Sequence, residues 1–203
     1  MRKLPASFYE RKNVLQVAKE LLGKVLVTKW NGIVTSGRIV ECEAYNGVAD
    51  RASHAFGGRR TARNEVMYGN AGSAYVYLCY GIHHLFNVVT NKKEIPHAIL
   101  IRALDPIEGI PEMLKRRKKK QFDYTVTKGP GSLSTALGIT VAHNGISLQS
   151  KQLYIADDGF IPAIKMIGKS GRIGVEYSGE AAAYPYRFFI KSNSFVSGKK
   201  KMA

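Results

Sequence analysis

Apolar and polar residues alternate with a period of two, as β-strands require, in several stretches of the chain. Glycine separates two pairs of these stretches, with Trp30-Asn31-Gly32 in the first pair and Gly81 in the second, which is typical of hairpin turns. Because strands joined by short turns pair in antiparallel fashion, we expect a meander sheet. The predicted strands cover residues 24–29, 33–45, 73–80, 85–90 and 98–104.

Helical signals stand between these strands. Asn13 is a possible N-cap, Gln16 occupies the third helical position, and Gly23 can end a short amphipathic helix. Asp105-Pro106-Ile107-Glu108 predicts a second helix start, with Asp as N-cap and Pro at the first position, leading into the basic run 115–120. Gly129-Pro130-Gly131-Ser132 opens a third helix that ends at Gly138.

The stretch from Asn46 to Gly72 has no clear period and is rich in Gly, Arg and His. We expect a long ordered loop with one short helix there, and loops of this length in compact domains are often functional. No linker separates the halves of the chain. We therefore predict one α+β domain over residues 1–203, with a curved antiparallel meander flanked by helices, a protruding aromatic hairpin and a basic tail at about 198–203.

The amino-acid composition indicates what kind of partner the protein binds. The chain has 31 Lys and Arg against 15 Asp and Glu, a net charge of +16, and the excess is spread over both halves. A hydrophobic share of 45% excludes a disordered polycation. A basic field over a whole domain indicates a polyanionic partner, of which nucleic acid is the usual one. Charge alone does not distinguish DNA, RNA or an acidic membrane.

Membrane insertion and secretion find no support in the sequence. The longest nearly unbroken apolar stretch, residues 74–82, is far shorter than the ~18–20 residues that cross a bilayer, and no apolar region follows the basic N-terminus. We expect a cytoplasmic protein associated with the nucleoid. Cys42 and Cys79 are too few for a zinc framework, so we interpret both as small buried hydrophobic residues.

The first candidate site lies on the predicted strand 33–45. Alternation places Glu41, Glu43 and Tyr45 on one face, with the two carboxylates roughly 7 Å apart. If water is excluded, such a pair raises the pKa of one member, which suits a general base near neutral pH. The alternative is an exposed strand face whose acids pair with Lys and Arg. By itself that alternative is the more common arrangement, but acids are scarce in this basic chain.

The hairpin around Gly81 is the second candidate. Tyr75 and Tyr77 stand on one strand, and the core is the default position for Tyr75. Tyr80 precedes the turn glycine and Ile82-His83 follow it, which is a costly set of side chains to expose without a partner. Aromatic rings stack on bases, and a residue at a hairpin tip can wedge into a duplex.

Other polar residues need partners or a role. His54 lies in the long loop, where a hydrogen bond that orders the loop is the plain interpretation, and no ligand set for a metal surrounds it in sequence. Asn87 and Arg102 lie in apolar strands, so each must face solvent or find a partner. The 129–132 helix start is capping or a phosphate cradle. Walker A, dinucleotide-binding and nucleophile-elbow motifs are absent from the sequence.

Several of these residues stand in ordered blocks that resemble the alkyladenine (3-methylpurine) DNA glycosylase family. The resemblance covers most of residues 20–140 and continues more loosely at residues 172–175 and 185–188. At Ile82 and His83 the chain departs from animal members, which carry Met and an aromatic residue. The matching blocks are residues 38–45, 53–64, 75–81 with Asn87, 101–106 and 129–130.

This resemblance implies a monofunctional enzyme that flips a damaged purine out of duplex DNA and hydrolyses its N-glycosidic bond without metal or cofactor. Glu43 would activate the water, and Arg102 would support the water and phosphate side. Tyr45, His54 and Tyr77 would sandwich the base, and Asn87 would disfavour guanine. Tyr80 would fill the gap in the stack, with Ile82 and His83 beside it in the minor groove.

Phosphate contacts would come from the basic residues, and a monomer is expected. One alternative is a non-catalytic module that binds tRNA or single strands with the same basic and aromatic residues. A third possibility is a basic structural protein without preference for damaged DNA. The candidate phosphate contacts are Arg59, Arg60, Arg63 and Lys128.

Overall fold

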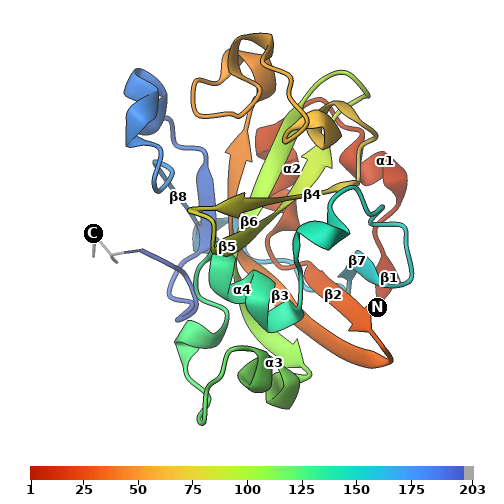
Figure 1. The fold of residues 1–203 in the computed structure, drawn as a ribbon. Coiled ribbons are helices and arrows are strands. Elements are labelled where there is room, and N and C mark those ends of the chain that lie inside the picture. Colours follow the sequence, from red (N-terminus) through yellow and green to blue (C-terminus); the bar gives the residue numbers. More distant parts are fainter. Residues whose placement is uncertain (199–203) are drawn as a thin grey trace.

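The computed structural model describes residues 1–198 of the chain and contains a nine-stranded antiparallel sheet (Figure 1). The spatial order is β1-β7-β2-β3-β6-β5-β4, and β9 pairs with both β3 and β8. The predicted α+β class is therefore confirmed. The strands are β1 (Arg2–Lys3), β2 (Val25–Trp30), β3 (Ile33–Tyr45), β4 (Ala74–Cys79), β5 (His83–Thr90), β6 (His97–Glu108), β7 (Leu153–Asp157), β8 (Ile167–Ser170) and β9 (Arg187–Ile190).

Four α-helices within residues 1–198 accompany the sheet, and those predicted at residues 13–23 and 129–138 are confirmed. The Asn13 side chain accepts a hydrogen bond from the Gln16 backbone N–H, as expected of an N-cap, and Gly138 ends its helix at φ +68°. In Figure 1, α3 and α4 lie together at the lower end of the sheet. The helices are α1 (Ala6–Tyr9), α2 (Val14–Leu21), α3 (Ile110–Arg116) and α4 (Pro130–Leu137).

Both predicted hairpins form, and their turns have left-handed backbone at two successive residues. Asn31 and Gly32 have φ +51° and +81°, and Tyr80 and Gly81 have φ +51° and +70°. Asn31 and Gly32 form the twist-matched two-residue turn of a tight hairpin, whereas three residues, Tyr80 to Ile82, separate β4 from β5. The sheet is only partly a meander, because β4, β5 and β6 are consecutive neighbours while β3 pairs with β6 across the intervening hairpin and loop.

The helix start predicted at Asp105-Pro106-Ile107-Glu108 is wrong. These residues extend β6 and pair with the beginning of β3, with Pro106 opposite Gly37 at an irregularity in the register. A proline is tolerated there because a bulge relieves the need for its missing N–H. Helix α3 begins only after Gly109, which has φ +77°. Long-range pairing with β3 thus overrides the local capping signal.

Gly109 gives a direct test of this junction. A Cβ at this position would overlap the carbonyl oxygen of Val34, and the positive φ strains any L-residue. We expect Gly109→Ala to destabilise the protein by about 1–2 kcal/mol for the backbone conformation and a further ~1–3 kcal/mol for the overlap. Gly32→Ala, where φ is +81° but the space is open, should show only the first cost in urea unfolding. Equal effects would contradict the close approach.

The long segment 46–72 is ordered by three short 3-10 helices rather than the single helix predicted. They are η1 (Gly47–Ala49), η2 (Phe56–Gly58) and η3 (Glu65–Tyr68). A small cluster of buried side chains separate from the main core, including Met67, Tyr68 and Tyr75, anchors this segment to the sheet. The loop is therefore held firmly beside the β4–β5 hairpin.

The remaining C-terminal part contributes short 3-10 helices and irregular segments that return to β3. These helices are η4 (Tyr124–Val126), η5 (Val141–His143), η6 (Ile164–Met166) and η7 (Glu176–Ala183). No helix within residues 1–198 is both long and apolar enough to span a bilayer. Apart from Gly198, the basic tail predicted at 198–203 lies outside the described residues.

Candidate active site

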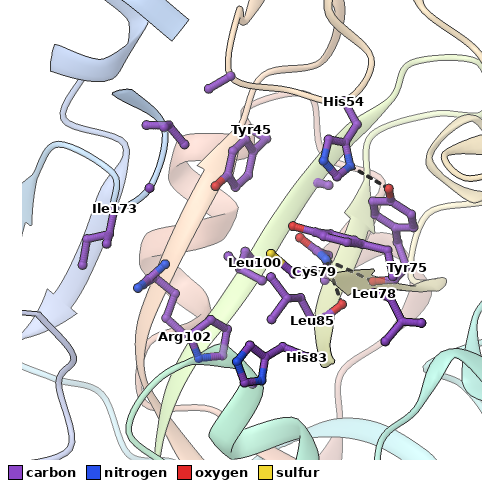
Figure 2. A pocket seen from close by; sticks show the side chains of 18 of the residues that line it. Tyr45, His54, Tyr75, Leu78, Cys79, His83, Leu85, Leu100, Arg102 and Ile173 are labelled. Atoms are coloured by element: carbon purple, nitrogen blue, oxygen red, sulfur yellow. Dashed lines mark hydrogen bonds between the residues drawn. The ribbon is translucent and has the colours of Figure 1, made fainter. Parts of the chain in front are cut away.

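A cavity of about 700 Å³ opens beside the aromatic hairpin. In Figure 2, Arg102 and Ile173 lie on one side of it, and His54 and Tyr75 lie on the other. Its walls combine β3, β6, the 46–72 loop, the hairpin, the start of α4 and residues 173–177. Segments far apart in the sequence therefore build one pocket of the size typical of ligand sites.

Glu43 lies in the sheet directly behind residues that line this pocket. Its side chain is fully buried and accepts hydrogen bonds from the Tyr45 hydroxyl at 2.9 Å and the Ile173 backbone N–H at 2.8 Å. Arg102 Nη1 lies 3.2 Å from Glu43 Oε1. Two carboxylate oxygens offer about four lone-pair directions, so this carboxylate keeps capacity to hold a water.

The electrostatics of Glu43 favour a proton acceptor whose pKa is raised. Burial raises the pKa of Glu43 above its usual value, while Arg102, the Ile173 N–H and Tyr45 oppose the rise and Glu41 adds to it. Burial also raises the pKa of Tyr45 well above its ordinary value, so its hydroxyl stays protonated and donates to Glu43. A carboxyl group with a raised pKa matches the task of general base catalysis.

The predicted common face of Glu41 and Glu43 is confirmed, because both contact Arg102. The alternative of an exposed acidic face is wrong, since both carboxylates are fully buried. Arg102 finds the partner that its place in an apolar strand requires. Glu41 also pairs with Arg187, at 2.7 Å, so two arginines and two glutamates share one buried cluster.

His54, Tyr75 and Tyr77 form an aromatic group on the other side of the pocket. The His54 and Tyr77 ring centroids are 4.7 Å apart at an interplanar angle of 69°, and the Tyr75 hydroxyl lies 2.8 Å from His54 Nδ1. Burial, together with Arg63 and Arg59, lowers the pKa of His54 to about 4. Its imidazole is therefore neutral near pH 7 and does not repel a cationic ring.

Asn87 lies in the pocket wall with its amide already engaged. It is buried, and its Nδ2 donates to the backbone oxygens of Tyr75 at 3.1 Å and Leu85 at 3.3 Å. Its side chain is thus fixed in one orientation, which suits a steric or polar selection of ligands. Cys42 is buried as predicted, but Cys79 is only partly buried and lines the pocket.

The tip of the hairpin exposes apolar side chains beside the pocket mouth. Tyr80 is 89% exposed and Ile82 is 71% exposed, while His83 lies against Gly131 at the start of α4. Tyr80 and His83 line the mouth, whereas Ile82 does not. Tyr80 holds a left-handed backbone that is strained for a bulky residue, and together with Ile82 it exposes apolar surface that a partner would cover.

The four candidate phosphate contacts occupy different surroundings. Arg63 lines the pocket, with its guanidinium 5.0 Å from the centre of the Tyr77 ring. Lys128 precedes the helix start and donates to the Ser194 carbonyl at 3.3 Å. Arg59 is exposed in the loop. Arg60 is bound by Glu65 and Glu94, so its charge is largely neutralised locally.

Sequence reasoning did not assign a role to the segment after β8. Arg172 holds Asp50 with both its terminal nitrogens and lies 4.8 Å from the Tyr45 ring centre. Ile173 supplies its N–H to Glu43, and Tyr177 lines the pocket and bonds the Ala52 carbonyl at 3.3 Å. In the sequence, the only signal for this segment was the looser resemblance to the family at residues 172–175.

Metal ligation is not provided for by the side chains described. Among residues 1–198, no three His, Cys, Asp or Glu side chains gather in a way that could hold a metal ion. The pocket instead combines a buried carboxylate with arginine, aromatic rings and a fixed amide. This set can stack a flat ring and move a proton beside it.

Comparison with known proteins agrees with this chemistry. A family model described as methylpurine-DNA glycosylase matches residues 7–194. A relative in Clostridium perfringens (strain 13), named "Putative 3-methyladenine DNA glycosylase" like the two below, is 44% identical over 97% of this chain and 100% of its own length. Those in Clostridium acetobutylicum and Bacillus cereus (strain G9842) are 48% identical, covering 98% and 96% of this chain and 99% and 98% of their own.

Proposed function

Because the chain belongs to the methylpurine-DNA glycosylase family, we propose that it is a monofunctional DNA glycosylase that removes alkylated or deaminated purines, such as 3-methyladenine and hypoxanthine, from duplex DNA. The observation that carries the proposal is the buried Glu43 carboxylate, which contacts Tyr45, Arg102 and Ile173 directly behind the wall of an aromatic pocket. A non-catalytic module would not require a carboxyl group held with a raised pKa at this place.

Access to the glycosidic bond requires the damaged nucleotide to leave the helix stack. Tyr80, exposed in the three-residue turn between β4 and β5, would enter the duplex and fill the gap. Ile82 and His83 would lie beside it in the minor groove. Arg59, Arg63 and Lys128 would contact phosphates, and Arg60 would do so only by giving up its acidic partners.

The flipped base would enter the pocket between Tyr45 and the His54–Tyr77 pair. A methylated purine carries positive charge and stacks well on aromatic faces. The neutral state of His54 suits such a ring. Asn87, fixed by its two bonds to the backbone, would crowd the exocyclic amine of guanine and so reduce the excision of normal bases.

Hydrolysis would then proceed through an oxocarbenium-like sugar, by analogy with glycoside hydrolysis. The water oxygen bonds to C1′ as the bond from C1′ to the base nitrogen breaks, and the electron pair of that bond leaves with the base. Glu43 takes the proton from the water. The Arg102 guanidinium, beside Glu43, would hold the water and the adjacent phosphate. The pocket, the plug residue Tyr80 and the general base Glu43 all come from one chain, so a monomer suffices.

The test uses the purified protein and duplexes that carry one 3-methyladenine or one hypoxanthine. Released base, and strand cleavage that appears only after hot alkali, would support a monofunctional glycosylase. Undamaged duplex is the control. Intact strands after alkali at every lesion tested, with binding retained, would instead identify a non-catalytic nucleic-acid module. Equal binding of damaged and undamaged duplex without cleavage would favour a basic structural protein.

Removal of the tip residue has a defined expected result. Tyr80→Ala should weaken binding to duplex with an abasic analogue by about 1–3 kcal/mol, the typical value of one stacked aromatic side chain. Tyr124→Ala removes another exposed tyrosine, 54% exposed and outside the pocket lining, and should leave that affinity unchanged. Fluorescence anisotropy measures both. Equal affinities for wild type and Tyr80→Ala would remove Tyr80 from its role as plug.

A further inference from the structure

Glu41 receives an unusual number of hydrogen bonds for a side chain that the proposed chemistry does not use. Its Oε1 accepts from Arg102 Nε at 3.0 Å, Arg187 Nε at 2.7 Å and Ser197 Oγ at 2.8 Å. Its Oε2 accepts from the backbone N–H of Ser197. The carboxylate is fully buried. Both its oxygens therefore serve protein groups and neither faces the pocket.

Arg102 is the shared member of this cluster and of the active site. Its Nε contacts Glu41, its Nη2 donates to Ser197 Oγ at 3.2 Å, and its Nη1 lies 3.2 Å from Glu43. The guanidinium is planar and rigid, so fixing two of its nitrogens fixes the direction of the third. The contact with Glu43 therefore depends on the contacts with Glu41 and Ser197.

We propose that Glu41 and Ser197 are positioning residues, which hold the Arg102 guanidinium so that its Nη1 lies on Glu43. The inference rests on the proposed function of Glu43 as the base. Neither residue touches the pocket, and each acts through Arg102.

By this proposal the C-terminal segment supports the active site through Arg102. Arg187, on β9, holds it through the Ser197 carbonyl at 2.6 Å, and Asn193 Nδ2 donates to Asp105 at 3.1 Å. Phe195 and Val196 are buried in the core between these points. The segment is fixed from Asn193 to the Ser197 carbonyl, so the Ser197 hydroxyl is held in place without contributing any reacting atom.

The charged groups around Glu43 determine in which direction its pKa moves when Arg102 is displaced. Arg102 lowers the pKa of Glu43, against the larger opposing effect of burial. A looser Arg102 would therefore raise that pKa and move the acid limb of the pH–rate profile to higher pH. The other groups that face Glu43 or contact its partners are Glu41 and Tyr45 on β3, Arg187 on β9, and Arg172 and Tyr177 after β8.

Ser197→Ala is the decisive variant, because it removes one hydroxyl and no charge. We expect the single-turnover rate of base release to fall by about 10- to 100-fold, as displaced catalytic groups typically cause. The acid limb should move to higher pH, while affinity for abasic duplex stays unchanged. Ser134→Ala is the matched control, since Ser134 is also buried but its hydroxyl has no partner among residues 1–198. A wild-type rate and profile for Ser197→Ala would overturn the inference.

Glu41→Gln separates positioning from charge. Loss of the Glu41 charge alone would lower the pKa of Glu43, because Glu41 raises it, and would move the acid limb to lower pH. Displacement of Arg102 instead moves the acid limb to higher pH. An upward shift with a reduced rate supports the proposal, and a downward shift or a wild-type rate overturns it. Glu112→Gln, which breaks the ion pair with Arg116, is the control. If Glu41→Gln does not fold, Ser197→Ala decides alone.

Failure of this inference is distinguishable from failure of the proposed function. Wild-type protein that releases no base from any lesion duplex contradicts the glycosylase. In that event a structure of Ser197→Ala still reports whether Arg102 keeps its 3.2 Å approach to Glu43. An unmoved Arg102 side chain would contradict positioning whatever the activity.

Discussion

Replacement of Glu43 by glutamine is expected to reduce the rate of base release by about 10²- to 10⁴-fold, the usual contribution of a general base. Glutamine has the same shape and can keep the surroundings intact. Its oxygen can accept from Ile173 and Arg102, and its amide can donate to the Tyr45 hydroxyl. What it lacks at neutral pH is the ability to accept the proton of the attacking water.

The measurement is single-turnover release from a hypoxanthine duplex, with affinity for the same duplex measured in parallel. Retained affinity with lost release supports the assignment, and full activity would contradict it. The pH profile adds a signed test. The base must be deprotonated, so the wild-type rate should fall as pH decreases through the raised pKa of Glu43. Any residual activity of the variant should lack that limb.

Asp50→Asn is expected to destabilise the fold by about 3–5 kcal/mol, because it leaves the Arg172 guanidinium buried without its counter-charge. The two side chains are 1% and 0% exposed and share two hydrogen bonds. Arg172 also donates to the backbone oxygens of Ala44 and Ala181. The loss should therefore loosen the segment that carries Ile173 to Glu43 as well as the fold.

Urea or thermal unfolding checks this value. At about 2–4 °C per kcal/mol for a chain of this size, the midpoint should fall by roughly 6–20 °C. Asp158→Asn is the control, because Asp158 pairs with Arg38 at the surface with 25% of its side chain exposed, and such pairs contribute about 0–1 kcal/mol. Equal losses in the two variants would show that burial of the Asp50–Arg172 pair has no special weight.

Local patterns predicted the elements that local forces decide. The Asn13 cap, the two tight turns and the shared face of Glu41 and Glu43 depend on residues a few positions apart, and the structure has all of them. The capping signal at Asp105 failed for the complementary reason. Its residues have better partners in β3, about seventy positions earlier in the chain, than a helix could offer them.

The partial burial of Cys79 was missed for a related reason. Its strand was correctly placed, but whether a side chain on it meets core or cavity depends on what packs against that face. The neighbouring walls come from β6 and residues 173–177. Nothing within a few residues of Cys79 carries that information.

The chain's order of residues was enough to establish a basic field, an aromatic hairpin tip, a pair of acids on one strand and a resemblance to a family. Tertiary structure alone decided that Glu43 is buried, that Arg102 and Ile173 bind it from 59 and 130 positions away, and that Ser197 closes the cluster. The physical reason is that hydrophobic alternation depends on neighbouring residues and net charge depends on the whole surface, so both can be read from the sequence. Burial and the pKa of a carboxyl group are set by whichever distant segments fold against it.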